Sequence, residues 1–171
     1  MPVTQFEDPE YLEAVYATLF SLLKSAVLPD SLVFNLSARL AEPPDSIAAA
    51  NQPALILFQG PMHAEQKEIF GPTKWIFTAV AAVYIRADTE TMNPVGTSTP
   101  IPATTANRIV WALAQAMGNS TTPGGTPMIY QRQELGGLVY HAWIEGEVIT
   151  SVVDQQMIVT VPINILAGPS D

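Results

Sequence analysis

Two histidines of this chain could serve as metal ligands through their imidazole nitrogens. His63 lies in the polar stretch PMHAEQKEIFGP, and His141 lies beside Tyr140 and Trp143 in a segment that alternates apolar and polar residues. Neither has a second histidine at the spacing of a metal-binding helix, and the chain contains no cysteine. We therefore expect no metal ion and interpret both histidines as ordinary side chains.

Two carboxylates could serve acid–base chemistry. Glu145 and Glu147 are two residues apart, so on a strand they would share a face, as do the carboxylates of some glycosidases. Any solvated strand offers the same arrangement. The glycine pairs in TPGGTP and QELGGL match no phosphate-binding motif, and we interpret them as turns and a strand entry. Because no nucleophile, base and orienting group can be assembled, we expect neither enzyme activity nor a cofactor.

The three tryptophans could form a wall on which a ligand stacks. Trp75 and Trp143 lie in segments with strand composition, however, and Trp111 lies in a segment with helical periodicity. A place in the core or in a subunit interface is favoured for all three.

Composition indicates one globular domain, residues 1–171. The chain has 171 residues, 48% of them hydrophobic, and a mean hydropathy of +0.22. The N-terminal MPVTQFEDPE is acidic and polar, so we expect a soluble intracellular product without a membrane anchor. Formal charge is −9, and the seven basic residues are scattered singly. A nucleic-acid site requires clustered positive charge, so nucleic-acid recognition is not expected.

The segment TKWIFTAVAAVYIRADTE, residues 73–90, predicts an unusually long strand. Its uncharged run between Lys74 and Arg86 is too short to cross a bilayer, which takes roughly 20 residues. It is rich in β-branched and aromatic residues, and both alternating sets are apolar. About 13 residues would extend for roughly 40 Å. Each face therefore needs cover from a helix, a sheet or another subunit.

The other elements are expected around that strand. Asp8 and Pro9 predict the start of a helix that runs to about Val27, followed by a short extended piece in SLVFNLSARL. PALILFQG, residues 53–60, predicts a strand that pairs with the long strand as an antiparallel hairpin. A second helix starts between residues 99 and 103 and ends before Gly118.

Two further strands complete the predicted fold. GLVYHAWIEGEVIT and QQMIVTVPINIL alternate apolar and polar residues and predict a second hairpin. Pro162 cannot donate to a ladder, so the last strand should lie at an edge or pair on one side only at that point. The expected fold is α+β, a four-stranded, mainly antiparallel sheet with two helices in the order α-β-β-α-β-β. Long surface loops are expected at residues 88–103 and 118–134.

The C-terminal third resembles a known family. LVYHAWIEGEVITSVVDQQMIVTVPINILAGPSD, with a polar DQQ turn before a strand that ends in VPINIL, is similar to the end of the tail terminator proteins of tailed bacteriophages, also called tail completion or minor tail protein U-like proteins. NQPALILFQG and the helix ANRIVWALAQAM resemble the same family. The resemblance covers most of the chain in order and spacing, although the two long loops exceed a minimal member.

The resemblance implies a structural virion protein. Members form a hexameric ring on the end of the tail tube, stop its polymerisation and present a surface to the head connector. It implies as partners other copies of the chain, the tail tube protein and a connector or neck protein, with DNA only as passing cargo. The long two-faced strand suits a ring subunit, and an acidic chain suits a channel through which DNA slides. The expected location is the virion, assembled in the host cytoplasm.

Specific surface residues follow as expectations. The candidates for the subunit or tail-tube interface are Trp75, Phe77, Tyr84, Arg86, Asp88 and Trp143. The candidates for lumen-facing acids are Asp88, Glu90, Glu145 and Glu147. The loop from residue 88 onward is expected to contact the next ring or tube layer. Two alternatives stay open: another head–tail connector or neck protein, and an acidic small-molecule-binding domain or enzyme in which the histidines and tryptophans converge.

Overall fold

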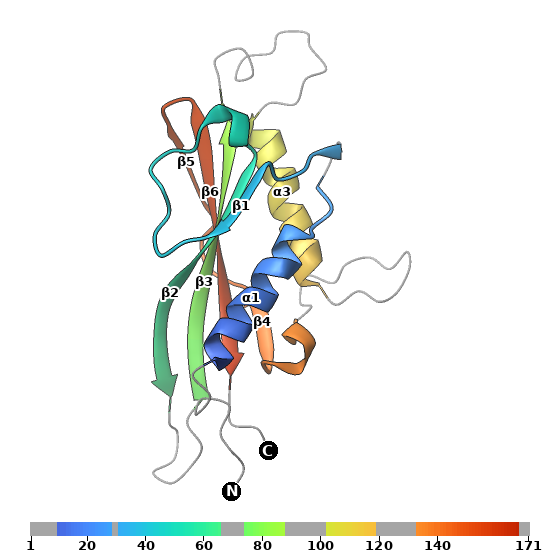
Figure 1. Cartoon of the computed structure of the whole chain (residues 1–171), viewed down its shortest axis with the longest axis vertical. Helices are drawn as coiled ribbons and strands as arrows, with labels where there is room; N and C mark the ends of the chain where they lie inside the picture. Colours follow the sequence, from blue (N-terminus) through green and yellow to red (C-terminus); the bar gives the residue numbers. More distant parts are fainter. Residues whose placement is uncertain (1–9, 29–30, 66–73, 88–101, 119–132, 168–171) are drawn as a thin grey trace, which may run out of the picture.

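Two helices lie on one face of a six-stranded sheet in the computed structural model, which describes residues 10–28, 31–65, 74–87, 102–118 and 133–167 (Figure 1). The α+β class and the two helices are confirmed. The elements in chain order are α1 (Tyr11–Lys24), β1 (Leu36–Arg39), the 3₁₀ turn η3 (Ala49–Asn51), β2 (Ala54–Glu65), β3 (Lys74–Arg86), α3 (Pro102–Met117), the 3₁₀ turn η4 (Leu135–Gly137), β4 (His141–Ile144), β5 (Ile149–Val153) and β6 (Gln156–Ala167).

The expected four-stranded sheet and the order α-β-β-α-β-β are wrong in detail. The strands are ordered β1-β2-β3-β6-β4, and β5 also pairs with β6. The piece expected to be extended before residue 40 joins the sheet as β1, parallel to β2. The segment expected to be one strand before the last turn is divided into β4 and β5, which pair with successive stretches of β6.

The long strand and its hairpin are confirmed. β3 covers 13 residues and pairs antiparallel with β2 on one side and with β6 on the other. β2 does not end at Gly60 but continues to Glu65, into the polar stretch PMHAEQKEIFGP. It accommodates Pro61 because the register shifts between Gln59 and Met62, and an irregularity of this kind tolerates a residue that cannot donate.

The helix boundaries differ from the expectation at the N-terminal helix. α1 ends at Lys24 rather than near Val27, and the expected cap at Asp8 and Pro9 lies outside the described residues. α3 begins at Pro102, inside the expected window, and Gly118 follows its last residue. Most of the two expected loops, 88–103 and 118–134, also lies outside the described residues.

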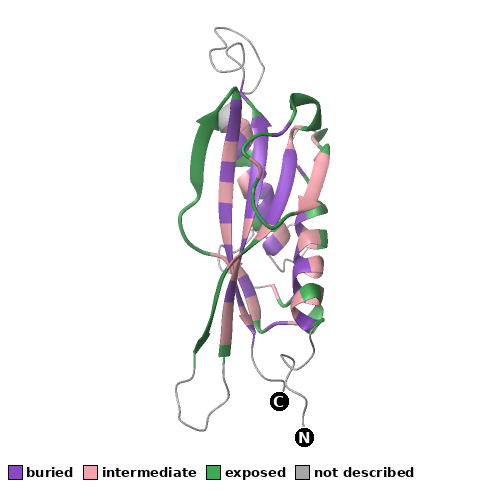
Figure 2. Ribbon diagram, turned by 60° about the vertical axis from the view of Figure 1, so that its left-hand side comes forward, coloured by how far each residue is buried: buried purple, intermediate pink, exposed green. Residues whose placement is uncertain are grey.

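The main core lies between the helices and one sheet face. Alternate residues of β3 and β6 point to this face, and their burial alternates along β6 (Figure 2). From the helices, Leu19 of α1 and Ile109 and Leu113 of α3 are fully buried against them. Full burial of such a side chain contributes about 1.5–3 kcal/mol, so this face holds the fold together.

The second sheet face is covered by the chain itself at one end. The connection from β1 to β2 crosses it there, and Ile47 packs with Ile56, Ala82 and Tyr84 in a smaller core. The Tyr84 hydroxyl donates to the carbonyl of Pro44 at 2.6 Å. The long strand therefore has cover on both faces over its C-terminal half, and both covers come from the same chain.

Pro162 pairs on one side only, which is one of the two arrangements the sequence predicted. It lies opposite Val80 of β3, while β4 and β5 stop on either side of it. β6 is not an edge strand, so the other arrangement is wrong. The Pro162 carbonyl accepts a hydrogen bond from the backbone N–H of Glu145 at 3.3 Å. The nitrogen and the carbonyl of a strand residue point to the same side. The nitrogen of Pro162, which has no hydrogen to donate, therefore faces the interruption between β4 and β5.

Candidate interaction surfaces

A band across the second sheet face carries half-buried side chains next to the small core. We define this open sheet face by seven residues: Ile76, Thr78 and Val80 of β3, Pro162, Asn164 and Leu166 of β6, and Trp143 of β4. The register places Thr78, Asn164 and Trp143 in one row across three strands. The face therefore alternates rows of apolar and polar side chains.

The polar row is connected by hydrogen bonds. Thr78 Oγ1 donates to Asn164 Oδ1 at 3.4 Å, and Asn164 Nδ2 donates to Glu145 Oε2 at 3.3 Å. The indole N–H of Trp143 donates to the same carboxylate oxygen at 2.5 Å. The carboxylate of Glu145 therefore orients Trp143. Such a row suits recognition by packing and hydrogen bonding.

The two glutamates do not share a strand face. Residues 145–148 form the interruption between β4 and β5, and Gly146 between the glutamates has a φ of 120°. Both glutamates are exposed. The expectation of a common strand face was wrong because Pro162 gives the outer strand no donor to pair with at this point.

The histidines lie at opposite ends of one row of the sheet. His63 is opposite Ile76, Ile76 is opposite Leu166, and Leu166 is opposite His141. Three strand spacings of about 4.8 Å separate the two histidines by roughly 14 Å, so they cannot coordinate one ion together. Within the described residues, no group of three metal-ligating side chains exists.

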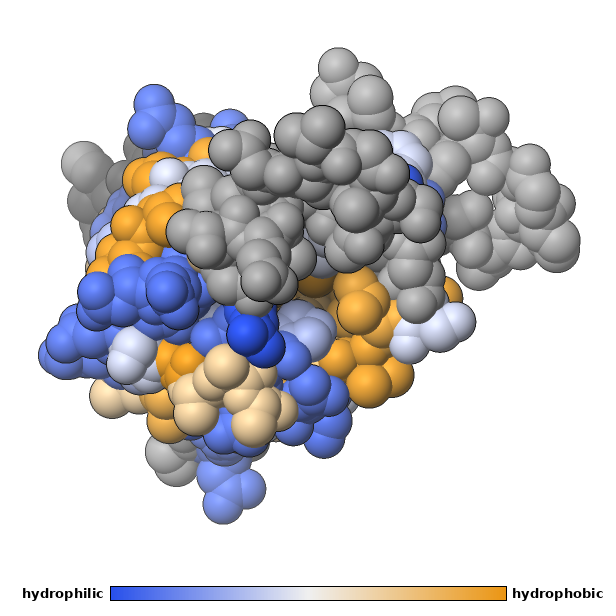
Figure 3. Space-filling view, turned by 90° about the horizontal axis from the view of Figure 1, so that it is seen from above, coloured by the Kyte–Doolittle hydropathy of each residue, from blue (hydrophilic) through white to orange (hydrophobic). Residues whose placement is uncertain are grey.

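A second surface is the outer edge of the sheet at β5. We define the β5 edge by its exposed apolar side chains, Val148, Ile149, Val152 and Val153. All five residues of β5 are exposed, and the strand stands out green in Figure 2. Figure 3 looks down on the end of the molecule that is uppermost in Figure 1, and it shows apolar side chains at the surface between polar ones.

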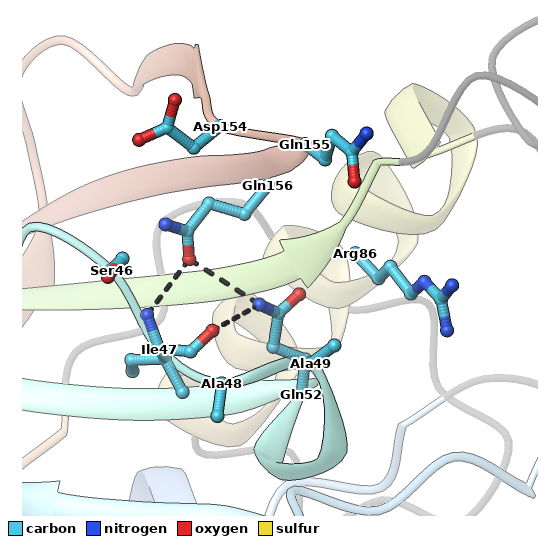
Figure 4. Close-up of a pocket in the computed structure, with 9 residues that line it drawn as sticks. All are labelled: Ser46, Ile47, Ala48, Ala49, Gln52, Arg86, Asp154, Gln155 and Gln156. Atoms are coloured by element: carbon cyan, nitrogen blue, oxygen red, sulfur yellow. Dashed lines mark hydrogen bonds between the residues drawn. The ribbon is translucent and has the colours of Figure 1, made fainter.

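A polar pocket of about 290 Å³ lies where the β1–β2 connection meets the start of β6 (Figure 4). Gln156 is 2% exposed, and its side-chain oxygen Oε1 accepts from the backbone N–H of Ile47 at 3.1 Å and from Gln52 Nε2 at 3.4 Å. Gln52 Nε2 also donates to the Ile47 carbonyl at 2.7 Å. These contacts hold the connection on the sheet, so the pocket has a structural explanation.

A second pocket, of about 360 Å³, lies where β1 ends beside α1. Arg39 forms a bidentate ion pair with Glu13, in which Arg39 Nη2 donates to Glu13 Oε2 at 2.8 Å. The hydrogen bond from Arg39 lowers the pKa of Glu13. Burial raises the pKa of Tyr16, which also lines the pocket, to about 12. Arg39 lines this pocket, and its ion pair joins β1 to α1.

The predicted interface residues are divided between the two sheet faces. Trp75 packs partly buried against the helix-side core, where Phe77 is fully buried and its ring lies 5.8 Å from that of Tyr16. Tyr84 is fully buried in the small core. The side chains of Phe77 and Tyr84 are therefore used inside the subunit.

The remaining predicted residues have different surroundings. Trp143 lies on the open sheet face, and Arg86 is exposed beside the polar pocket. Asp88 and Glu90 lie outside the described residues. Trp111, the third tryptophan, is 53% exposed on α3.

The β5 edge was missed by the sequence reasoning. Its signal was present: VITSVV is a β-branched run without charge, and it was interpreted only as part of a hairpin. The DQQ turn was identified, and the structure places Asp154 and Gln155 there with φ of 46° and 64°.

Comparison with known proteins shows no family for this chain. No protein-family model matches the chain, and no curated protein matches it. A solved structure titled "Virion of native gene transfer agent (GTA) particle" contains a chain that is similar over 92% of this chain and 93% of that chain. The identity is 12% and the TM-score is 0.42. No described helix is long and apolar enough to cross a membrane.

Proposed function

We propose that this protein is a structural subunit of a phage-like virion. In this role it would form a ring on the end of a tail tube, stop tube polymerisation and offer the surface to which the head joins. The sequence resemblance to tail terminators suggests the role. The observation that supports it in the structure is the open sheet face, a band of half-buried apolar and polar side chains beside a core that is otherwise complete.

The chemistry of the open sheet face suits a contact between subunits. Trp143, Val80 and Pro162 supply apolar area, and the Asn164–Glu145 hydrogen bond lies beside them. Interfaces combine an apolar centre rich in tryptophan with polar groups around it. A closed ring needs two different surfaces on each subunit, and the face can supply one of them.

A structural role also accounts for the charge and the scattered polar residues. The histidines lie far apart on the sheet, which speaks against the small-molecule-binding alternative. A negative ring wall does not hold phosphates, so a net charge of −9 suits the passage of DNA. Glu147 is exposed and remains a candidate for the lumen.

Trp143→Glu tests the proposal, with Trp111→Glu as the matched control. Light scattering and native mass spectrometry should find rings, most simply hexamers, for the wild type alone or on purified tail tubes. Trp143→Glu should weaken assembly at least tenfold, because truncating a central interface tryptophan costs about 2–4 kcal/mol. Trp111→Glu, on the helix side, should assemble normally.

Three outcomes would count against the proposal. Wild-type protein that stays monomeric both alone and on tail tubes would contradict the ring. Rings that bind portal-side assemblies and ignore tube ends would assign the chain to the neck. Equal assembly by Trp143→Glu, with an unchanged melting temperature, would remove the open sheet face from the contact.

A further inference from the structure

The β5 edge differs from an ordinary sheet edge because all its residues are exposed and, among the described strands, only β6 pairs with it. Val153 and Gln156 flank a two-residue turn, so the backbone N–H of each donates to the backbone carbonyl of the other. The same exchange occurs at every second residue pair of the β5–β6 ladder. The backbone groups of Thr150 and Val152 then point away from β6. They form a short template for another strand, bordered by exposed valine and isoleucine side chains.

At the opposite edge of the same sheet, the part of β2 that β1 leaves uncovered is protected against strand addition. β1 covers the first part of β2, up to Leu57. Beyond it, β2 carries Pro61, a register shift between Gln59 and Met62, and the charged Glu65. Proline, irregularity and charge are the devices by which natural edges avoid pairing. β5 has no proline and no charged residue, and its register with β6 is regular.

The surroundings of the β5 edge are acidic. Glu147 precedes β5 and Asp154 follows it, and both are exposed. Residues 133–167 contain four carboxylates, Glu134, Glu145, Glu147 and Asp154, and neither lysine nor arginine. An added strand would therefore meet negative charge at both of its ends, which favours a partner with basic residues there.

A second copy of the chain fits this edge poorly. If two copies of β5 paired antiparallel about Ser151, Glu147 would lie opposite the partner's Gln155, next to the partner's Asp154, and the mirrored contact would repeat this. Like charges would then meet twice. Pairing with the part of β2 beyond Leu57 in a second copy would meet Pro61 and the irregular register.

We infer that the β5 edge binds an extended apolar segment of another protein, with lysine or arginine at both ends of the segment, as an added antiparallel strand. Main-chain hydrogen bonds to Thr150 and Val152 supply affinity, and the flanking acids supply selectivity. The inference goes beyond the proposed ring and does not depend on it, because the edge belongs to the isolated subunit.

Peptide binding to the full chain tests the inference. The probe is a labelled nine-residue peptide of alternating valine and threonine with two lysines at each end, followed by fluorescence anisotropy. It should bind saturably, and binding should weaken as salt screens the flanking charges. The same peptide with glutamates at its ends should bind at least tenfold more weakly. Failure of the lysine-flanked peptide to bind would overturn the inference.

Variants of β5 locate the binding. Val152→Pro removes an outward N–H without removing a bond to β6, so it should lower affinity at least tenfold with the melting temperature nearly unchanged. Val152→Lys should also weaken binding, whereas Val33→Lys, the same change at an exposed valine outside the sheet, should not. Undiminished binding by Val152→Pro would overturn the inference. So would a wild-type dimer that Val152→Pro converts to monomer, since the occupant would then be a second copy.

Discussion

Two tyrosine hydroxyls of α1 hydrogen-bond to backbone carbonyls outside the helix layer. Tyr11 of α1 donates to the carbonyl of Leu138 at 2.6 Å, and Tyr16 donates to the carbonyl of Thr78 at 3.2 Å. Burial raises the pKa of both hydroxyls to about 12. Both contacts join residues far apart in sequence, so each contributes to the tertiary fold.

These tyrosines predict a loss of stability in alkali. A group whose pKa is raised by folding stabilises the folded state fully below its unfolded pKa, near 10 for tyrosine, and ceases to do so as pH passes the folded value. Urea unfolding should therefore show the free energy of unfolding falling between about pH 10 and pH 12. The fall should be smaller in Tyr11→Phe, which at pH 7 should lose about 0.5–1.5 kcal/mol with its hydrogen bond. An identical fall in Tyr11→Phe would assign the effect to other groups.

Among the elements, the outer strand is shaped by one glycine and one proline. β4 and β5 follow the same side of β6, and the interruption between them lies at Gly146, opposite Pro162. A Cβ added at Gly146 would lie 3.0 Å from Pro162 Cγ, and the φ of 120° is itself unfavourable for other residues. The interruption leaves β5 as a separate edge element.

Gly146→Ala should destabilise the fold through backbone strain and through the close approach of the new Cβ to Pro162. Gly136→Ala is the matched control, because Gly136 also has a positive φ, 71°, but no atom within 4 Å of an added Cβ. Backbone strain of this kind costs about 1–3 kcal/mol. Thermal and urea unfolding should show the larger loss for Gly146→Ala, and the double change with Pro162→Ala should recover part of it. Equal losses at the two glycines would mean that the proline contact does not matter.

Sequence patterns predicted the elements whose cause is local. β3 was recognised from its β-branched run, and α3 from apolar residues at helical spacing, of which Ile109 and Leu113 are fully buried. β1 could only be called extended, since its strand character comes from parallel pairing with β2, 15 or more residues away in the chain. Tyr84 was expected at a subunit interface, but Pro44 and Ile47 of the same chain lie over it. Both belong to a proline-rich connection without hydrophobic periodicity, so no sequence signal indicated that this segment packs on the sheet.

For the whole molecule, the balance between charge and exposed apolar surface governs assembly. The formal charge is −9, so copies of the chain repel one another, while the open sheet face offers apolar area. The β5 edge is the opposite case, because its acidic flanks favour a basic partner. The two surfaces therefore differ in how added salt affects them.

Ring formation should increase with ionic strength, whereas binding of the lysine-flanked peptide should decrease. Salt shortens the range of charge repulsion to about 10 Å at 0.1 M and about 3 Å at 1 M, which removes part of the cost of bringing acidic subunits together. Light scattering from about 0.05 M to about 0.5 M NaCl should show the oligomeric fraction rising. Glu147→Gln combined with Asp154→Asn lowers the formal charge from −9 to −7 and should reduce this salt dependence. The two changes should also weaken peptide binding. Rings that dissociate as salt rises would show that attractive ion pairs, rather than apolar packing on the open sheet face, hold the subunits together.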